Sequence, residues 1–309
     1  MTCPPAETCN GPREEICSPT PRGSGDSPKA MNQPGHKGLG YELSRPRIAV
    51  LMGSSAGSQY VFSRLASEVD LVAVVRQERP RREVLRAVFR RTKKLRRGYW
   101  LDRLLLGAYT KLKLKRQAVA CSEYREVRSA ESFAADCPIH RVESINDPSV
   151  IDVLQQAQPE LVVVLGTSIL KEPVLAAAPC FVNLHAGITP MYRGAHGQFW
   201  AVLNRDFDNV GVTLHFVDKG IDTGAIVKQG RFAFEPAIDN LLTLLAKSSV
   251  TGAQLLLDWI HVNRADFRAS PRLVPPGPSQ LHYSPGLSDY RKFEQVAREL
   301  LANQFRKVA

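Results

Sequence analysis

Short, almost unbroken runs of apolar residues recur along the chain and limit its fold more than any other feature. The clearest are IAVLM at 48–52, DLVAVV at 70–75 and ELVVVLG at 160–166. Strands of a parallel sheet that are covered on both faces have this character, whereas half-exposed strands alternate apolar and polar residues. Apolar residues at helical spacing follow the first run, and a helical segment opened by Pro148 precedes the third. This alternation predicts an α/β domain, Rossmann-like, with a mainly parallel twisted sheet flanked by helices.

The second half of the chain continues the pattern. Residues 210–217 and 225–232 are predicted to be strands, 239–261 a long helix and 288–306 an amphipathic helix. We therefore predict three parts. Residues 1–46 form a disordered segment, residues 47–262 form one main folded domain, and residues 263–309 form a short helical C-terminal extension.

The first 46 residues are rich in Pro, Gly, Ser and charge, and such a stretch buries too little apolar surface to offset its ordering entropy. Met31 is an alternative start. Cys3, Cys9 and Cys17 lie in this segment, and Cys121, Cys137 and Cys180 follow later. None of them forms a CxxC or a Cys/His cluster, so we expect neither a disulfide framework nor a bound metal.

The net charge of +11 is concentrated in one segment. Residues 76–116 hold sixteen Lys and Arg against three acidic residues, together with a Leu cluster and a Tyr-Trp pair, and predict a basic helical insert. Three interpretations stay open: a solvated charged face, an amphipathic helix on an anionic membrane, or contact with nucleic-acid phosphates. The chain has neither the apolar core of a secretory signal nor an apolar run of membrane-spanning length. We expect a cytoplasmic protein, and the basic insert suggests that it could also make peripheral contact with the inner face of the membrane. The sequence does not define the oligomeric state.

Polar residues stand where chemistry is expected in an open parallel sheet. Asn183 and His185 lie at the end of the apolar stretch 181–184, so they should be in the crevice beyond the carboxyl ends of the strands. Asp222 lies in the loop between the two later strands and can return to that crevice. Asn and imidazolium N–H groups can donate to an oxyanion, and a carboxylate can orient the imidazole and raise its pKa. Each residue also has an ordinary structural interpretation, but the set suits attack of an amine on a carbonyl carbon, without a covalent acyl-enzyme.

Two stretches resemble a known family. FVNLHAGITPMYRGAHGQFWAVLN (181–204) and GVTLHFVDKGIDTGAIVKQ (211–229) look like the 10-formyltetrahydrofolate-dependent formyltransferases, which act on glycinamide ribonucleotide, methionyl-tRNA or nucleotide sugars. The resemblance covers about residues 47–235 and implies the formyltransferase fold. It departs at Gly187-Ile188-Thr189-Pro190, where many members have Ser-Leu-Leu-Pro.

The resemblance implies a role for particular residues. Asn183, protonated His185 and Asp222 would be catalytic, because an amine attacks the formyl carbon of 10-formyltetrahydrofolate and the first two donate to the oxyanion. His215, Pro190 and Gly194 would support the site. No metal is implied. The pterin ring would lie against two loops, which in this chain correspond to Gly166, Ile169 and Leu170 and to Asp218, Lys219, Gly220 and Ile221.

The acceptor amine is less constrained. The loop GSSAGSQ at 53–59 opens a helix, where free N–H groups favour an anion, and it resembles the phosphate loop of the glycinamide ribonucleotide enzyme at Gly57 and Ser58. We expect an amino sugar on a nucleotide or lipid phosphate. Phosphoribosylglycinamide or methionyl-tRNA formylation are the alternatives, although nucleic acid is disfavoured because few residues follow the 239–261 helix. A folate-binding or membrane-associated scaffold is the non-enzymatic alternative.

Overall fold

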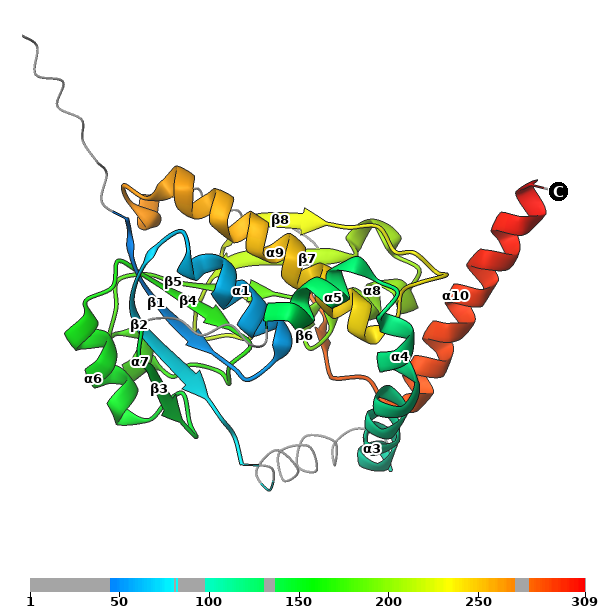
Figure 1. Ribbon diagram of the computed structural model, residues 1–309, viewed down its shortest axis with the longest axis horizontal. Coiled ribbons are helices and arrows are strands. Elements are labelled where there is room, and N and C mark those ends of the chain that lie inside the picture. Colours follow the sequence, from blue (N-terminus) through cyan, green and yellow to red (C-terminus); the bar gives the residue numbers. More distant parts are fainter. Residues whose placement is uncertain (1–44, 81, 83–97, 131–136, 270–277, 309) are drawn as a thin grey trace, which may run out of the picture. The chain divides into compact units, whose positions relative to one another are not determined.

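The computed structural model describes residues 45–80, 82, 98–130, 137–269 and 278–308 (Figure 1). The predicted disordered segment lies outside these residues apart from its last two positions. Residues 83–97 of the basic insert also lie outside them.

A seven-stranded sheet forms the centre of the described domain, in the order β3-β2-β1-β4-β5-β7-β8. The first five of these strands pair in parallel, and β7 and β8 add an antiparallel edge. This confirms the predicted α/β fold with a mainly parallel sheet. The strand bounds are Arg47–Met52 (β1), Asp70–Gln77 (β2), Ile139–Val142 (β3), Leu161–Leu165 (β4), Phe181–His185 (β5), Gly211–Phe216 (β7) and Ile226–Arg231 (β8).

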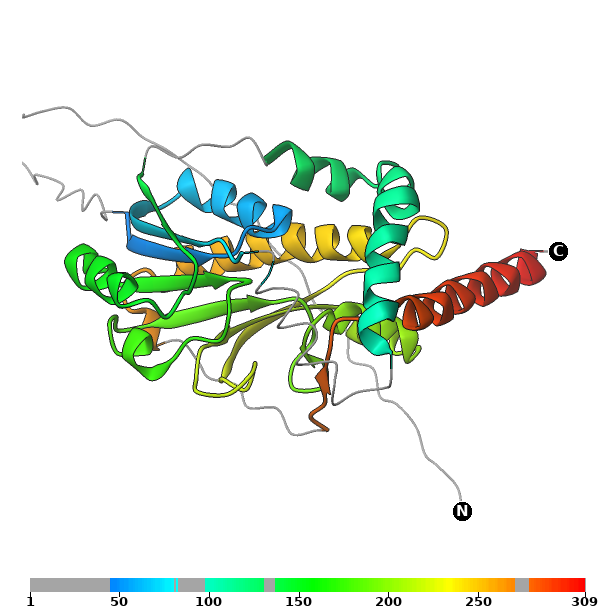
Figure 2. The ribbon, with the colours of Figure 1, turned by 90° about the horizontal axis from the view of Figure 1, so that it is seen from below.

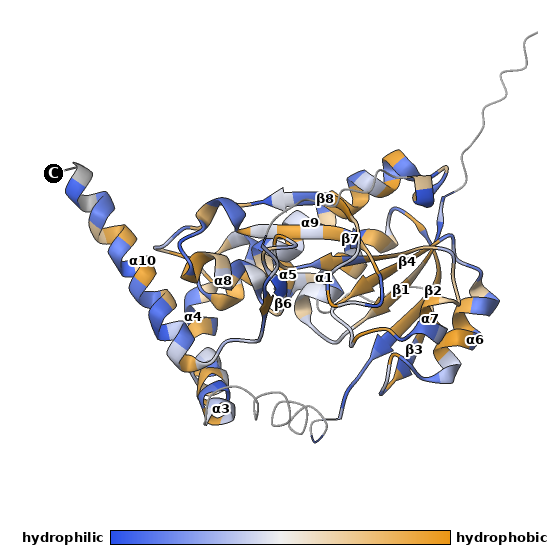
Figure 3. Ribbon diagram, turned by 180° about the vertical axis from the view of Figure 1, so that it is seen from behind, coloured by the Kyte–Doolittle hydropathy of each residue, from blue (hydrophilic) through white to orange (hydrophobic). Residues whose placement is uncertain are grey.

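Alternate residues of each central strand face opposite sides of the sheet, and each side has its own core. Ile48 and Val50 of β1 pack with residues of α1 and α9, whereas Ala49 and Leu51 pack with residues of α6 and α7. All four side chains are buried, which explains why the strands appear as continuous apolar runs. Figure 3 shows the strands as a hydrophobic band between helices of mixed character.

Helices cover both faces of the sheet. Those of the first half are α1 (Ala56–Ala66), α3 (Tyr99–Tyr109), α4 (Lys115–Ala118), α5 (Ser122–Ser129), α6 (Pro148–Ala157) and α7 (Glu172–Leu175). Those of the second half are α8 (Gly197–Leu203), α9 (Leu241–Asn263) and α10 (Leu287–Val308). The long helix begins two residues later than predicted because Asn240 caps it, accepting from the amides of Leu242 and Thr243. It continues past the predicted boundary at 262, to Asn263.

The predicted insert 76–116 is not helical throughout. Its first two residues belong to β2, and the first helix with bounds in the described part of the insert begins at Tyr99. A π-helical turn at Thr110–Leu114 joins α3 to α4, so one continuous helix runs to Ala118. This helix crosses the beginning of α10 (Figure 2).

The C-terminal extension returns to the middle of the domain. Leu281–His282 form strand β9, which pairs in parallel with the short strand β6 at Arg193–Gly194. Further along, α10 packs on α3 and α8, and Tyr290 and Phe293 stack with Phe199 in a third core cluster. Among the described residues, no helix has both the length and the hydropathy required to cross a bilayer.

Candidate active site

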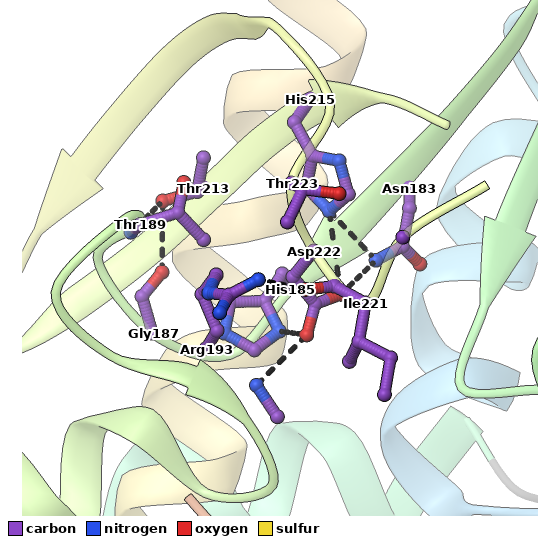
Figure 4. Close-up of polar contacts among 12 residues, drawn as sticks. Asn183, His185, Gly187, Thr189, Arg193, Thr213, His215, Ile221, Asp222 and Thr223 are labelled. Atoms are coloured by element: carbon purple, nitrogen blue, oxygen red, sulfur yellow. Dashed lines mark hydrogen bonds and ion pairs between the residues drawn. The ribbon is translucent and has the colours of Figure 1, made fainter. Parts of the chain in front are cut away.

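The end of β5 places Asn183 and His185 beside β7. Asn183 is paired in register with His215, and His185 with Thr213. Because the side chains of residues two apart on a strand point to the same face, Asn183, His185 and His215 meet at one edge of the sheet (Figure 4). They line a cavity of about 860 Å³ together with Asp222. The structure therefore brings the three predicted catalytic residues and one predicted supporting residue into one cluster.

Asp222 is the hub of this cluster. One carboxylate oxygen, Oδ2, accepts from the amide of Gly194 at 2.9 Å and lies 3.3 Å from Nδ1 of His185. The other, Oδ1, lies 3.4 Å from Nδ2 of Asn183 and 3.5 Å from Nε2 of His215. Burial alone would raise the pKa of this carboxyl, but the contacts with His215, His185 and the Gly194 amide outweigh it and lower the pKa to about 2. Asp222 is therefore ionised at neutral pH.

The backbone around Asp222 adopts a conformation that few residues tolerate. Its φ is +50°, in the left-handed region, where Asp is among the more readily accepted non-glycine residues. Such conformations persist when surrounding contacts enforce them, and they concentrate at functional sites. Here the hydrogen bond to Gly194 and the donation from Arg193 Nη1 to the Ile221 carbonyl hold the loop against β6.

His185 differs from the expectation of a protonated imidazole. Only 6% of its side chain is exposed, and this burial lowers the pKa of the ring despite the upward effects of the Asp222 carboxylate and the Tyr192 carbonyl. The carboxylate does raise this pKa, as expected, but burial lowers it by more, and the net direction is downward. Nε2 lies 2.8 Å from the Tyr192 carbonyl oxygen, which places an acceptor at each ring nitrogen.

Gly187 allows that contact. A Cβ atom on Gly187 would lie 2.5 Å from the Tyr192 carbonyl oxygen and 2.8 Å from Nε2 of His185. Both separations are far below van der Waals contact, so a side chain here would push the carbonyl away from the imidazole. Gly187, which stands where many family members have the Ser of Ser-Leu-Leu-Pro, thus lies against the predicted catalytic residue His185.

His215 fixes the orientation of Asn183. Its Nδ1 lies 2.8 Å from the Phe216 carbonyl oxygen, which can only accept. In the neutral ring Nδ1 must therefore carry the hydrogen, and Nε2 accepts from Nδ2 of Asn183 over 3.0 Å. This hydrogen bond determines which end of the Asn183 amide is nitrogen. His215 is a positioning residue for Asn183.

The predicted cofactor loop after β4 is held by side chains of residues outside the loop. Gly166, Ile169 and Leu170 all line the cavity. Gln77, at the end of β2, accepts from the amide and the hydroxyl of Ser168, and Asn146 donates to the Ile169 carbonyl. These side chains keep the loop in one conformation. The sequence signal for them was weak, because Gln77 lies about ninety residues from its partner.

In the second predicted cofactor loop, three of the four predicted residues line the cavity and one does not. Asp218, Gly220 and Ile221 line the cavity, and the Asp218 carboxylate accepts from the Gly220 amide and the Thr223 hydroxyl. Lys219 is absent from the cavity wall and is exposed, and its ammonium lies 3.1 Å from Glu172. Its predicted contact with a cofactor has no geometric support.

Gly57 and Ser58 also line the cavity, at the beginning of α1. However, the amide of Ser58 donates to the Ser55 hydroxyl, which caps the helix, and the Ser58 hydroxyl donates to the Leu165 carbonyl. Both donors of Ser58 are thus used within the domain. Of the remaining supporting residues, Gly194 lines the cavity, whereas Pro190, which follows a cis peptide bond, lies outside its wall.

Three arginines on the cavity wall were not predicted. Arg79 follows β2, Arg103 belongs to α3 and Arg128 belongs to α5. Residues 281–284, at and after β9, complete the wall from the C-terminal extension, where His282 is buried and stacks between Tyr192 and Trp200. The stretch SQLHYSPG was the available signal for this part of the site. Within the described ranges, no group of three or more His, Cys, Asp or Glu residues is arranged to hold a metal ion.

Comparison with known proteins finds formyltransferases similar to this chain. Residues 112–258, which include all four clustered residues, match the family model described as formyl transferase. The chain is 31% identical over 143 residues to the methionyl-tRNA formyltransferase of Chlorobium chlorochromatii, covering 46% of this chain and 45% of that enzyme. It is 34% identical over 154 residues to the Thermodesulfovibrio yellowstonii enzyme of the same name, covering 48% and 47%.

Solved structures show weaker likenesses. A sugar N-formyltransferase from a Shewanella species aligns with a TM-score of 0.49 and 15% identity, over 82% of this chain and 86% of that one. Phosphoribosylglycinamide formyltransferase from Streptococcus pneumoniae aligns with a TM-score of 0.45 and 20% identity, over 70% and 98%. The chain spans about half the length of the curated relatives it matches. The stretch that carries Asn183, His185, His215 and Asp222 is thus similar to the formyl transferase family.

Proposed function

We propose that this protein transfers a formyl group from 10-formyltetrahydrofolate to a primary amine. The observation that carries the proposal is the cluster of Asn183, His185 and Asp222 on the wall of a single large cavity, with an ionised carboxylate at its centre. The family match includes all three residues. In the net reaction the amine nitrogen gains the formyl carbon and loses a proton, and a nitrogen of the folate gains a proton.

The chemistry requires a donor to an oxygen that becomes negative, and a charge that balances it. Nδ2 of Asn183 is an uncharged donor held in a fixed orientation by His215, which uses one of its two hydrogens. The other hydrogen makes only a long contact of 3.4 Å with Asp222 and is the one that would donate to the oxyanion. His185 is neutral in the resting site, but an acceptor faces each of its nitrogens, so both contacts become hydrogen bonds only when it is protonated. A negative charge that develops in the cavity would favour that protonated form, and Asp222 would support it.

The cavity also fits the folate. Its volume suits a ligand of drug size or larger, and two of its lining side chains, Ile169 and Ile221, are apolar yet exposed. Each belongs to one of the two predicted cofactor loops, so an aromatic ring between those loops would cover both. The folate supplies the formyl carbonyl; the protein supplies the loops at 166–170 and 218–222, which would bind and orient it.

The acceptor is proposed to carry an anionic group in addition to its amine. Three arginines line the cavity from the segment after β2, from α3 and from α5, whereas its lining carboxylates, Asp218 and Asp222, belong to the loop of the predicted folate site. Guanidinium groups are suited to phosphate recognition. An amino sugar on a nucleotide or lipid phosphate satisfies this requirement, and so does glycinamide ribonucleotide.

A second candidate is formylation of methionyl-tRNA. The curated relatives described above favour it, because they are named methionyl-tRNA formyltransferases. The chain matches about half of their length. The basic charge of residues 76–116 would suit an RNA backbone as well.

A panel assay separates these candidates. Purified full-length protein is incubated with 10-formyltetrahydrofolate and one acceptor at a time, and tetrahydrofolate release is followed by absorbance. The acceptors are aminodeoxy nucleotide sugars, glycinamide ribonucleotide and methionyl-tRNA, with a mixture lacking any acceptor as control. Release that depends on a phosphorylated small amine supports the proposal, and release only with methionyl-tRNA selects the second candidate. Release without an acceptor would indicate hydrolysis, and folate binding without release would indicate the scaffold; either would overturn the proposal.

The arginines are tested in the same assay. Arg103→Ala and Arg128→Ala should raise the KM for the phosphorylated acceptor and leave the KM for the folate unchanged. Arg64→Ala, at the end of α1 and outside the cavity wall, is the matched control. Unchanged acceptor KM in both variants would contradict the anionic-acceptor part of the proposal.

A further inference from the structure

Helix α3 presents one side to the cavity and another to solvent. Tyr99 and Arg103 line the cavity. On the other side, Trp100, Leu101, Leu104 and Leu105 are exposed by 42%, 48%, 45% and 47%, although all four are large and apolar. Residues at i, i+1, i+4 and i+5 share one face of a helix. These four side chains, the α3 apolar face, therefore form one contiguous patch.

The helix is fixed in the domain through its other side. The Tyr99 hydroxyl donates to the Ser284 carbonyl, and the Asp102 carboxylate accepts from the amide and hydroxyl of Ser288. Leu106 is buried in the third core cluster with residues of α8 and α10. Because the helix is already docked by these contacts, the exposure of the α3 apolar face is a property of the folded domain. Monomeric soluble proteins rarely leave such patches uncovered without a partner.

The surroundings of the face are cationic. Lys111, Lys115 and Arg116 are exposed on the continuation of the same helix, and Leu112 is exposed among them. Asp102 is the one acidic residue within 99–118, and it is engaged by Ser288. In the sequence, residues 83–97 immediately before α3 add seven further Lys and Arg.

Charge decides between two partners that could cover an apolar face. A second copy of the chain would bring two cationic surfaces together, and juxtaposed like charges oppose association. An anionic lipid surface complements the same charges, while Trp and Leu side chains enter the boundary between headgroups and acyl chains. We propose that the α3 apolar face docks this protein on an anionic membrane surface. Docking places the cavity wall about one helix diameter, roughly 10 Å, from the lipid.

Vesicle sedimentation tests this proposal without requiring catalysis. The full-length protein is mixed with vesicles of phosphatidylcholine alone, or of phosphatidylcholine and phosphatidylglycerol in equal parts. We expect sedimentation with the anionic vesicles only, weakened by high salt. The double variant Leu101→Ser/Leu105→Ser should lower the affinity for anionic vesicles by about tenfold or more, since two leucine side chains that enter the lipid on docking are lost. Val262→Ser, which removes an exposed apolar side chain on α9, should not change it.

Two results would overturn the proposal. The first is binding to anionic vesicles that the double variant leaves unchanged, or no binding by the wild-type protein. The second is a concentration-dependent dimer, seen by sedimentation velocity, that the double variant abolishes; the face would then be covered by a second copy. Neither result bears on formyl transfer to a soluble acceptor, which the double variant should retain because its two leucines lie outside the cavity wall.

Discussion

The side-chain amide of Asn183 donates to Nε2 of His215 over 3.0 Å, and the opposite nitrogen of that ring donates to a backbone carbonyl. The histidine is thereby locked as a hydrogen-bond acceptor towards Asn183. An amide that could otherwise rotate by half a turn has its nitrogen fixed within the cluster around Asp222.

Replacing this acceptor should impair the reaction without removing a group that contacts substrate. We expect His215→Phe to lower kcat by about tenfold to a hundredfold and to leave the KM for the folate nearly unchanged, because Asn183 loses its orientation. Steady-state kinetics measure this division between kcat and KM. His140→Phe is the matched control, since His140 lies on β3 outside the cavity wall and also bonds one side chain. Equal kcat in the two variants would argue against the positioning role.

The link between the C-terminal extension and the site depends on Gly194. Its φ is +91°, and a Cβ atom there would lie 2.2 Å from the His282 carbonyl oxygen. Gly194→Ala should displace β9 and the amide that donates to Asp222, with a cost of about 1–3 kcal/mol in the free energy of unfolding and a loss of activity. Denaturant unfolding and the formyl-transfer assay measure the two effects.

Gly107→Ala is the control for that variant. Gly107 lies in α3, and a Cβ atom would meet nothing within 4 Å, so alanine there should stabilise the helix slightly. If Gly194→Ala were as stable and active as this control, β9 would not be needed to complete the site.

Burial of His196 should make stability depend on pH. The pKa of its imidazole is lowered to about 4, chiefly by burial and also by the charge of Arg103. The unfolded chain takes up this proton near pH 6.5 and the folded chain only near pH 4, so stability is lost as the pH falls between these values. Allowing for partial exposure of the side chain, we expect a loss of roughly 2 kcal/mol.

His196→Asn should remove most of that dependence. The backbone at this position has a φ of +59°, which Asn adopts more readily than most residues. Urea unfolding of both proteins at pH 7 and at about pH 4.5, where most of the loss has accumulated because the unfolded chain is already protonated, measures the difference. If the variant loses as much stability between pH 7 and pH 4.5 as the wild-type protein does, other groups cause the acid sensitivity.

A buried ion pair supports the helix that covers the sheet. Nζ of Lys247 in α9 lies 3.0 Å from Asp239 and 2.6 Å from Glu235, and the Asp239 side chain is fully buried. Lys247→Met should cost about 3–5 kcal/mol, because it leaves a buried carboxylate without its cation. Thermal and urea unfolding measure this, with the exposed Lys228→Met as control. Equal stability of the two variants would mean that Asp239 is neutralised in another way.

The sequence was most informative where structure is local or repeats along a strand. The apolar runs identified β1, β2 and β4 because both faces of these strands are covered, and Asn183 and His185 were placed at the sheet edge because they end a strand. What could not be predicted depends on pairs far apart in the chain. Asp102 bonds Ser288, and Gly194 pairs with His282, and neither contact leaves a periodic signal.

The lowered pKa of His185 was missed for a related reason. The sequence names the carboxylate that raises this pKa, but the burial that lowers it comes from the whole fold. The arginines of the cavity wall likewise come from three separate elements, and two of them lie within a segment whose charge had suggested a solvated surface as readily as a binding site.

The central claim is that the Asn183, His185 and Asp222 cluster transfers a formyl group, and Asp222→Asn tests it most directly. The isosteric amide keeps the size of the side chain but removes the charge beside both histidines. With the acceptor that gives the highest rate in the panel assay, we predict that kcat falls by about a hundredfold or more while circular dichroism and folate binding are retained. Formyl transfer by the variant at the wild-type rate would contradict the account.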